Sequence, residues 1–265
     1  MSVSPVAGAV YGLQTNQNRL SSATQSLATG RKSSIDNAPA FVLADGLQQR
    51  ADAVTSFQGA SSDAINTAQV ASGGLSSIRA VVGQLQGLAA QAAASSDPTQ
   101  RAALGNQYDQ LRSQISGLAS DSSYNGVNLI GANPSTVTIP GITTGTNQTV
   151  TGQAADATGL GISTSNSWAT SAANAQTDLN ALTKSQQSLD STSQTLASTT
   201  ASLQTNVNFA QAQTGTLQLG VAQATNADPN QAAASALAAQ TYQQTSIAAL
   251  KIGVQSQQSV LRLFA

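Results

Sequence analysis

A seven-residue repeat of apolar residues runs through the second half of the chain. It consists of Leu182, Leu189, Leu196, Leu203 and Leu217, with Ala210 at the position between the last two leucines. Seven residues is the coiled-coil period, so this seam is predicted to face another helix along its length. The neighbouring line of the repeat is half polar, and no charged residue lies between Asp190 and Asp228. The pattern therefore predicts a structural rod that close packing, not salt bridging, holds together.

Both ends of the chain carry narrower apolar stripes. The early stripe consists of Val6, Leu13, Leu20 and Leu27, and the late one of Ile247, Val254 and Leu261, followed by Phe264. Residues 1–18 and 229–250 contain no charged side chain. Nothing else in the chain is obviously left to cover these stripes, so we expect them to pack between subunits.

Turn signals divide the remaining sequence into helices. A helix is predicted from about Pro39 to Ala94, a second from Pro98 to the turn at 125–126, and a third over 171–226. Asp97 and Asp228 each precede a proline, which is the pattern of a helix N-cap. We interpret both as caps and not as catalytic carboxylates.

Residues 121–172 differ from the rest, because frequent glycines separate short β-branched pieces that predict strands and hairpins. The predicted fold is mainly α: a long antiparallel helical coiled-coil bundle with a small β-hairpin region between its two halves. The order of elements is palindromic, so the chain is predicted to fold back on itself, with its two ends together and its middle farthest away. The predicted parts are paired terminal helices (1–38 and 229–265), a helical rod (39–132 and 171–228) and a short β-rich region (133–170).

Composition excludes several classes of function. All eleven acidic residues are Asp, and the chain has no Glu, His or Cys. We therefore expect no catalytic residues, no metal site and no cofactor. Ten basic residues are scattered singly, which argues against a nucleic-acid partner. No run is long enough for a membrane span, and the first eighteen residues do not resemble a cleaved signal peptide. The single tryptophan, Trp168, is predicted to be a buried plug.

Several short segments, in this order, resemble bacterial flagellin. They are 27–31 (LATGR), 35–38 (IDNA), 124–130 (YNGVNLI) and 259–264 (SVLRLF). The resemblance covers roughly 1–131 and 173–265, with a short variable middle between them. The chain is thus similar to the short flagellins that have a reduced central region.

That resemblance implies a non-enzymatic structural subunit that assembles into a helical flagellar filament for swimming. The filament would lie outside the cell. The terminal helices would form its inner core, the long helices of the rod its surrounding shell, and the β-rich region would face outward. The implied partners are many copies of the same chain, the flagellar type III export machinery with an export chaperone, and the hook-associated and cap proteins. Two alternatives remain: a hook–filament junction protein of the same superfamily, and a type III secreted coiled-coil translocator.

One departure from the family concerns an immune receptor. Flagellins that the innate receptor recognises carry a basic residue four positions before the leucine that matches Leu88, where this chain has Gln84. A neutral amide cannot make the charge-assisted contacts of an arginine. We therefore expect weak or absent receptor activation.

Overall fold

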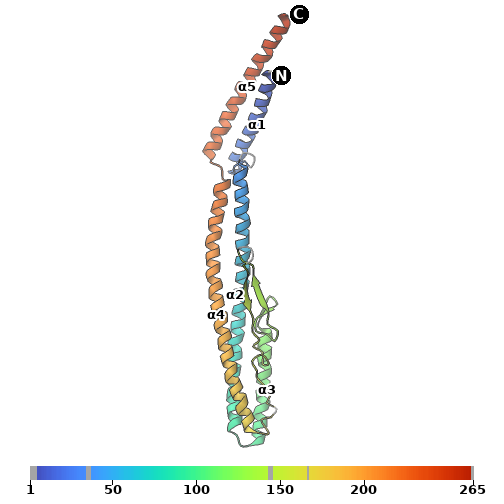
Figure 1. Ribbon diagram of the computed structural model, residues 1–265, viewed down its shortest axis with the longest axis vertical. Helices are drawn as coiled ribbons and strands as arrows, with labels where there is room; N and C mark the ends of the chain where they lie inside the picture. Colours follow the sequence, from blue (N-terminus) through green and yellow to red (C-terminus); the bar gives the residue numbers. More distant parts are fainter. Residues whose placement is uncertain (1–4, 34–36, 143–145, 166, 264–265) are drawn as a thin grey trace. The chain divides into compact units, whose positions relative to one another are not determined.

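A computed structural model of the chain describes residues 5–33, 37–142, 146–165 and 167–263, and all of their side chains except 5–7, 257 and 260–263. It divides into two compact units (Figure 1). The terminal unit comprises Met1–Ala51 and Gly215–Ala265, and the middle unit comprises Asp52–Thr214. Each unit thus joins sequence from both halves of the chain.

The chain is mainly helical, as predicted. Its elements in order are α1 (Pro5–Thr29), α2 (Ala38–Ala94), α3 (Pro98–Asp121), β1 (Ser123–Tyr124), β2 (Val127–Asn128), β3 (Thr136–Ile139), β4 (Gln148–Thr151), α4 (Ala172–Thr225) and α5 (Pro229–Leu263). None of the helices, as far as the structure describes them, is long and apolar enough to cross a membrane.

Helix boundaries follow the capping signals in the sequence. The side chain of Asp97 accepts a hydrogen bond from the backbone N–H of Thr99 at 2.8 Å, which caps α3. Asp228 caps α5 in the same way, with the N–H of Asn230 at 2.8 Å. Gly30 follows the end of α1 with φ +67°, the left-handed conformation that commonly ends helices. Both aspartates are therefore caps, as expected.

In the middle unit, α2 and α4 run antiparallel and bury the leucine seam. Leu182, Leu189, Leu196 and Leu203 are each at most 3% exposed. The side-chain amide of Gln58 donates a hydrogen bond to the hydroxyl of Thr214 at 3.2 Å. Arg79, which comes later in α2, forms an ion pair with Asp190, which comes earlier in α4, so the two helices run in opposite directions. Figure 1 shows the two helices side by side over this stretch. Leu217, the last seam leucine, is buried within the terminal unit.

The β structure consists of two small antiparallel hairpins. Asn125 and Gly126 have φ of +48° and +78°, which is the combination that a tight type I′ hairpin turn requires. This turn joins β1 to β2, so our prediction that α3 extends to it is wrong: α3 ends at Asp121. In the second hairpin Val137 pairs with Val150. Val150 is 3% exposed, so one face of the hairpin is packed against the unit.

The terminal unit is held at one end by paired loops. The N–H of Lys32 donates to the carbonyl of Thr225 at 2.7 Å, and the N–H of Ala227 donates to the carbonyl of Gly30 at 2.9 Å. The ammonium group of Lys32 also reaches the carbonyls of residues 223 and 224 at 3.3 and 3.2 Å. A cation at the last carbonyls of a helix is favourable, so Lys32 stabilises the end of α4.

Candidate assembly surface

The two terminal helices, α1 and α5, lie side by side and run antiparallel (Figure 1). The face of α5 that is turned to α1 follows a three-and-four spacing of mostly small or polar residues. Its members are Ala232, Ala236, Ala239, Gln243, Ser246, Leu250 and Gly253, of which the three alanines are buried and the others half-buried. Small residues let two helix backbones approach closely. The pair therefore forms without using the large apolar residues of α5.

A buried hydrogen bond joins the two helices. The side-chain Nδ2 of Asn16 donates to the carbonyl oxygen of Ala239 at 2.7 Å, and Asn16 is only 5% exposed. One turn away, a Cβ built on Gly12 lies 3.4 Å from the hydroxyl of Tyr242. The hydrogen bond and the close approach of Tyr242 to Gly12 both favour this alignment of α1 and α5.

Large apolar side chains remain open around the rest of α5. Leu237 and Ile252 are each 65% exposed, and Tyr242 is 52% exposed. At 100° per residue, Leu237 and Ile252 lie opposite the face covered by α1, whereas Tyr242 and Ile247 lie on its two flanks. Large apolar side chains left open on several sides of a helix are typical of a surface that other protein covers.

Exposed apolar side chains are concentrated on the terminal unit. Of the large hydrophobic side chains that the structure describes as exposed, eleven belong to this unit and two, Val70 and Phe209, to the middle unit. The middle unit buries its own large residues, including Phe57, Leu75 and Trp168. The terminal unit therefore has the larger exposed apolar surface, which is typical of a surface that binds other protein.

The residues that the sequence indicated for subunit packing have different surroundings. Leu13 and Leu20 are half-buried in the described structure. Leu27, Ile247 and Val254 are 42%, 41% and 41% exposed. The side chains of Val6 and Leu261, and the whole of Phe264, lie outside the described residues. Sequence reasoning missed the small-residue face of α5, because alanine and serine give little hydrophobic periodicity.

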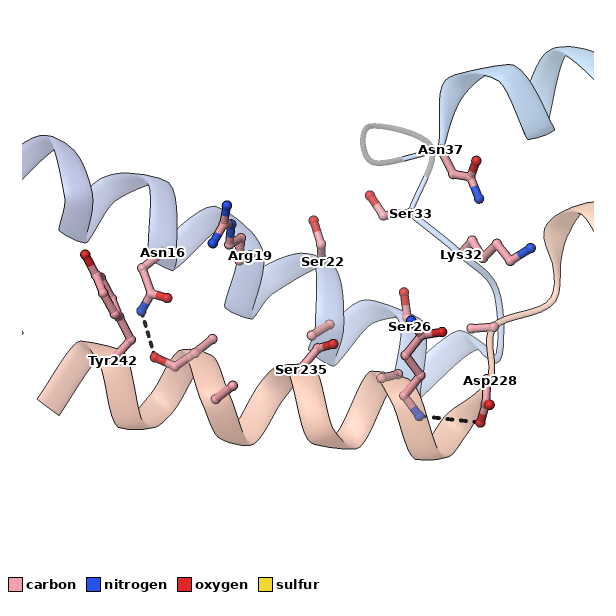
Figure 2. Close-up of a pocket in the computed structure, with 16 residues that line it drawn as sticks. Asn16, Arg19, Ser22, Ser26, Lys32, Ser33, Asn37, Asp228, Ser235 and Tyr242 are labelled. Carbon is pink, nitrogen blue, oxygen red and sulfur yellow. Dashed lines mark hydrogen bonds between the residues drawn. The ribbon is translucent and has the colours of Figure 1, made fainter. Parts of the chain in front are cut away.

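A groove of about 630 Å³ runs between α1 and α5. Figure 2 shows Asn16 and Tyr242 at one end of it and Asp228 with Lys32 at the other, with Ser22 and Ser235 between them. Its remaining walls are mainly Ala and Ser side chains. Arg19 also lines the groove, beside Asn16, so charged side chains occur toward both of its ends.

In the middle unit, Trp168 is buried beside α3 and α4, as a plug should be. Its indole Nε1 donates to a carboxylate oxygen of Asp178 at 2.6 Å, and its ring centroid lies 4.6 Å from that of Tyr108. Burial raises the pKa of Asp178, while the bond from Trp168 lowers it and the charge of Asp109 raises it further. Burial chiefly, and the charge of Asp178 next, raise the pKa of Tyr108.

Another line of polar residues on α4, four positions before each of the first seam leucines, binds a neighbouring segment. The residues buried beside the first seam leucines are Asp178, Ser185 and Thr192. The hydroxyl of Ser185 donates to the carbonyl of Leu160 at 2.8 Å, and that of Thr192 to the amide oxygen of Gln153 at 3.2 Å. These side chains bind the irregular segment that precedes α4, which lacks regular partners of its own.

Gln84 is exposed on α2 and lines a groove between α2 and α3. The other polar lining residues of this groove are also glutamines: Gln91, Gln107 and Gln110. The lining of this groove is therefore uncharged.

Metal-ligating side chains do not cluster in the part of the chain that the structure describes: no three of them come together.

Comparison with known proteins finds similarity to bacterial flagellins. The family model for the bacterial flagellin N-terminal helical region matches residues 7–134. Flagellin FljK of Caulobacter vibrioides (strain ATCC 19089 / CIP 103742 / CB 15) is 27% identical over 272 residues, covering 99% of this chain and 98% of the relative. Flagellin FljO of the same organism is 26% identical over 269 residues with the same coverage.

A crystal structure of Bacillus cereus flagellin is also similar, with a TM-score of 0.49 and 24% identity over 57% of this chain and 88% of that chain. The family model and the relatives that span nearly the whole chain agree with the helical fold described above. Along nearly its whole length the chain is similar to bacterial flagellins, and these comparisons support a non-enzymatic structural subunit of the extracellular flagellar filament.

Proposed function

We propose that the terminal unit carries the contacts that polymerise this chain. The observation that supports this is the uneven distribution of exposed apolar side chains, eleven on the terminal unit against two on the middle unit among the described residues. Burying one Leu, Ile or Val side chain is worth about 1.5–3 kcal/mol. Burial of several such side chains per copy therefore favours assembly.

The contact surface combines the predicted stripes with the open faces of α5. Leu27, Ile247 and Val254 belong to it, together with Leu237 and Tyr242. These residues lie on different sides of their helices. Each copy would therefore meet several neighbours through different faces, and such heterologous contacts extend into a helical polymer without closing.

The same reasoning supports a layered filament. We assign 1–38 and 229–265 to the inner core, because these segments contain the uncharged stretches and the open apolar faces. The rod, 39–132 and 171–228, would surround the core, and the β-rich segment 133–170 would face solvent. The last assignment is supported by the exposed, polar strand positions of the β3–β4 hairpin.

Exposed apolar helices are a liability before assembly. We infer that an export chaperone covers α5 in the cytoplasm and that the flagellar type III machinery delivers the chain to the hook-associated and cap proteins at the tip. Such a chaperone could bind the exposed apolar side chains of Leu237, Ile247 and Ile252.

A single charge on the proposed surface tests the assignment. Leu237→Asp in the full-length chain is expected to abolish filaments, because an uncompensated carboxylate would enter an apolar contact. Filament yield is measured by sedimentation and electron microscopy. Fluorescence of Trp168, the single tryptophan, reports independently that the middle unit stays folded.

Val70→Asp is the matched control, since Val70 is one of the two large apolar residues exposed on the middle unit. It is expected to leave filament yield within about twofold of the unmodified protein. Normal filaments from Leu237→Asp, or equal loss from both variants, would show that the terminal unit is not the dominant contact surface.

A further inference from the structure

The turn between β1 and β2 contains the only Asn-Gly pair of the chain, Asn125-Gly126. Both residues are exposed, and the side-chain amide of Asn125 has no hydrogen-bond partner among the residues that the structure describes. Glycine has no side chain to keep its backbone nitrogen away from the amide carbon of the preceding asparagine. This turn therefore combines a free amide with a sterically open nucleophile.

We propose that Asn125 is a site of spontaneous covalent modification, and that its conversion to isoaspartate opens the β1–β2 hairpin. The backbone nitrogen of Gly126 attacks the side-chain Cγ of Asn125 and forms a C–N bond. The bond from Cγ to Nδ2 breaks, and ammonia leaves with the proton of the Gly126 N–H. The product is a five-membered succinimide. The inference concerns a single copy of the chain and does not rest on the proposed function.

Water, the one co-reactant, then opens the succinimide ring. Cleavage of the bond between the Gly126 nitrogen and the side-chain carbonyl gives aspartate. Cleavage at the backbone carbonyl gives isoaspartate, in which the main chain runs through the former side chain. Both products replace a neutral amide by a carboxylate, and isoaspartate also lengthens the main chain by one carbon.

Asn128, three residues later in the same hairpin, is an internal comparison. Its Nδ2 donates to two carbonyl oxygens near the end of α3 at 2.8 and 3.0 Å, and its Oδ1 accepts from two backbone N–H groups just after β2 at 2.9 and 2.7 Å. Attack on its Cγ would break these four hydrogen bonds. The next residue is Leu129, which is buried and hinders the approach of its own nitrogen. Asn128 is therefore expected to stay intact while Asn125 reacts.

The hairpin delays the reaction without preventing it. Asn125 has φ +48°, and in this left-handed conformation the nitrogen of Gly126 points away from the Asn125 side chain. The pairing of Tyr124 with Val127 holds the conformation, so the attack requires the hairpin to open. β1 and β2 have only two residues each, and short two-stranded hairpins are marginally stable. Local opening therefore gives access to the reaction without global unfolding.

The two products have different structural effects. Aspartate tolerates the left-handed conformation, so it keeps the turn. Isoaspartate puts an extra carbon into a turn that fits two residues, so Tyr124 and Val127 no longer pair. The opening is expected to stay local, because the four hydrogen bonds of Asn128 hold the chain at the end of α3.

Mass spectrometry of the aged full-length chain measures the conversion at each position. Electron-transfer fragmentation distinguishes isoaspartate from aspartate, and Trp168 fluorescence reports that the middle unit stays folded. In a mildly alkaline buffer, Asn125 is expected to convert at least about tenfold faster than Asn128, since only Asn125 lacks hydrogen bonds. Conversion of Asn125 that is no faster than that of Asn128 would overturn the proposal.

Two variants separate the chemistry from the structure. Gly126→Asn keeps a residue that tolerates positive φ but places a side chain beside the attacking nitrogen, so it is expected to slow the conversion at least about tenfold. Asn125→Gly keeps the turn and removes the amide, so ageing should leave hydrogen exchange at the Val127 N–H unchanged. In the unmodified sequence this exchange should become faster as isoaspartate accumulates. Equal conversion in Gly126→Asn, or isoaspartate without faster exchange, would contradict the proposal.

Discussion

Asn16 on α1 donates its side-chain amide to the backbone carbonyl of Ala239 on α5, at 2.7 Å and out of contact with solvent. Around this bond the two helices meet mostly through alanine, glycine and serine, which would pack nearly as well in a shifted alignment. The bond favours the observed alignment, because a shift that unpairs the buried amide costs the free energy of an unsatisfied polar group. A buried amide in a helical seam is a known means of fixing register at some cost in stability.

Replacement of Asn16 therefore separates stability from register. Asn16→Ala is expected to cost about 0.5–1.5 kcal/mol, the net value of one hydrogen bond, and to lower the dissociation temperature of filaments. Asn16→Leu is expected to keep the helices paired but to let them shift, so filaments should show mixed helical parameters by electron microscopy. Uniform filaments of unchanged geometry from Asn16→Leu would show that the bond does not determine the register.

Replacing either of two adjacent glycines in α2 by alanine is expected to change the stability of the middle unit in opposite directions. A Cβ at Gly74 would lie 2.8 Å from Cδ1 of Ile130 and would also meet Ser122, whereas one at Gly73 meets nothing within 4 Å. Gly74→Ala is thus expected to destabilise the middle unit by about 1–3 kcal/mol through overpacking. Gly73→Ala is expected to stabilise it by up to about 1 kcal/mol through helix propensity. Urea denaturation followed by Trp168 fluorescence measures both, and a stabilising Gly74→Ala would refute the packing at α2.

The buried carboxyl of Asp178 predicts a pH effect with a definite sign. Because burial raises its pKa in the folded state, the folded protein binds more protons than the unfolded chain just above the ordinary pKa of Asp. Stability contributed by this group is therefore present at low pH and falls as the pH rises through the folded-state pKa.

Asp178→Asn keeps an oxygen acceptor for Trp168 and removes the buried charge. It is expected to raise the melting temperature at about pH 8 and to change it little at about pH 3.5. Asp178→Leu, the control, leaves the indole N–H unpaired and is expected to cost about 1–3 kcal/mol at both values. Equal effects of Asp178→Asn at both pH values would contradict the raised pKa.

The neutral side chain at Gln84 is expected to weaken activation of the innate flagellin receptor. The side chain is exposed in a groove whose polar lining is otherwise glutamine. A reporter assay is expected to show a weak response to the unmodified protein and a stronger one to Gln84→Arg, which restores a charge-assisted contact. Gln110→Arg serves as the control for added charge alone. A full response to the unmodified protein at low dose would reject this prediction.

Much of the fold was predictable, because its signals are local. The leucine seam is buried as the seven-residue period requires, and the Asp-Pro pairs at 97–98 and 228–229 mark the starts of α3 and α5. The end of α3 was not, because Asn125 and Gly126 read equally well as a helix stop and as a hairpin turn. Only strand pairing of Tyr124 with Val127 separates the two.

The assembly surface was harder to predict, for a physical reason. Ile247 and Val254 stand out in the sequence, but α1 packs on the neighbouring face that contains Ala236, Ala239 and Gln243. Close helix packing prefers small side chains, and these have little hydrophobic signal. The buried line of Asp178, Ser185 and Thr192 was hidden in the same way, since its partners lie in a segment without regular structure.

The central claim is that neighbouring copies cover the open faces of α5, and thiol protection tests it most directly. Leu237→Cys and Ile247→Cys, each the single cysteine in its chain, are labelled with a maleimide in the monomer and in intact filaments, with Ser77→Cys on the exposed face of α2 as the reference. We predict that labelling at 237 and 247 falls at least tenfold on polymerisation relative to the reference. Labelling at the same rate in monomer and filament would contradict the account.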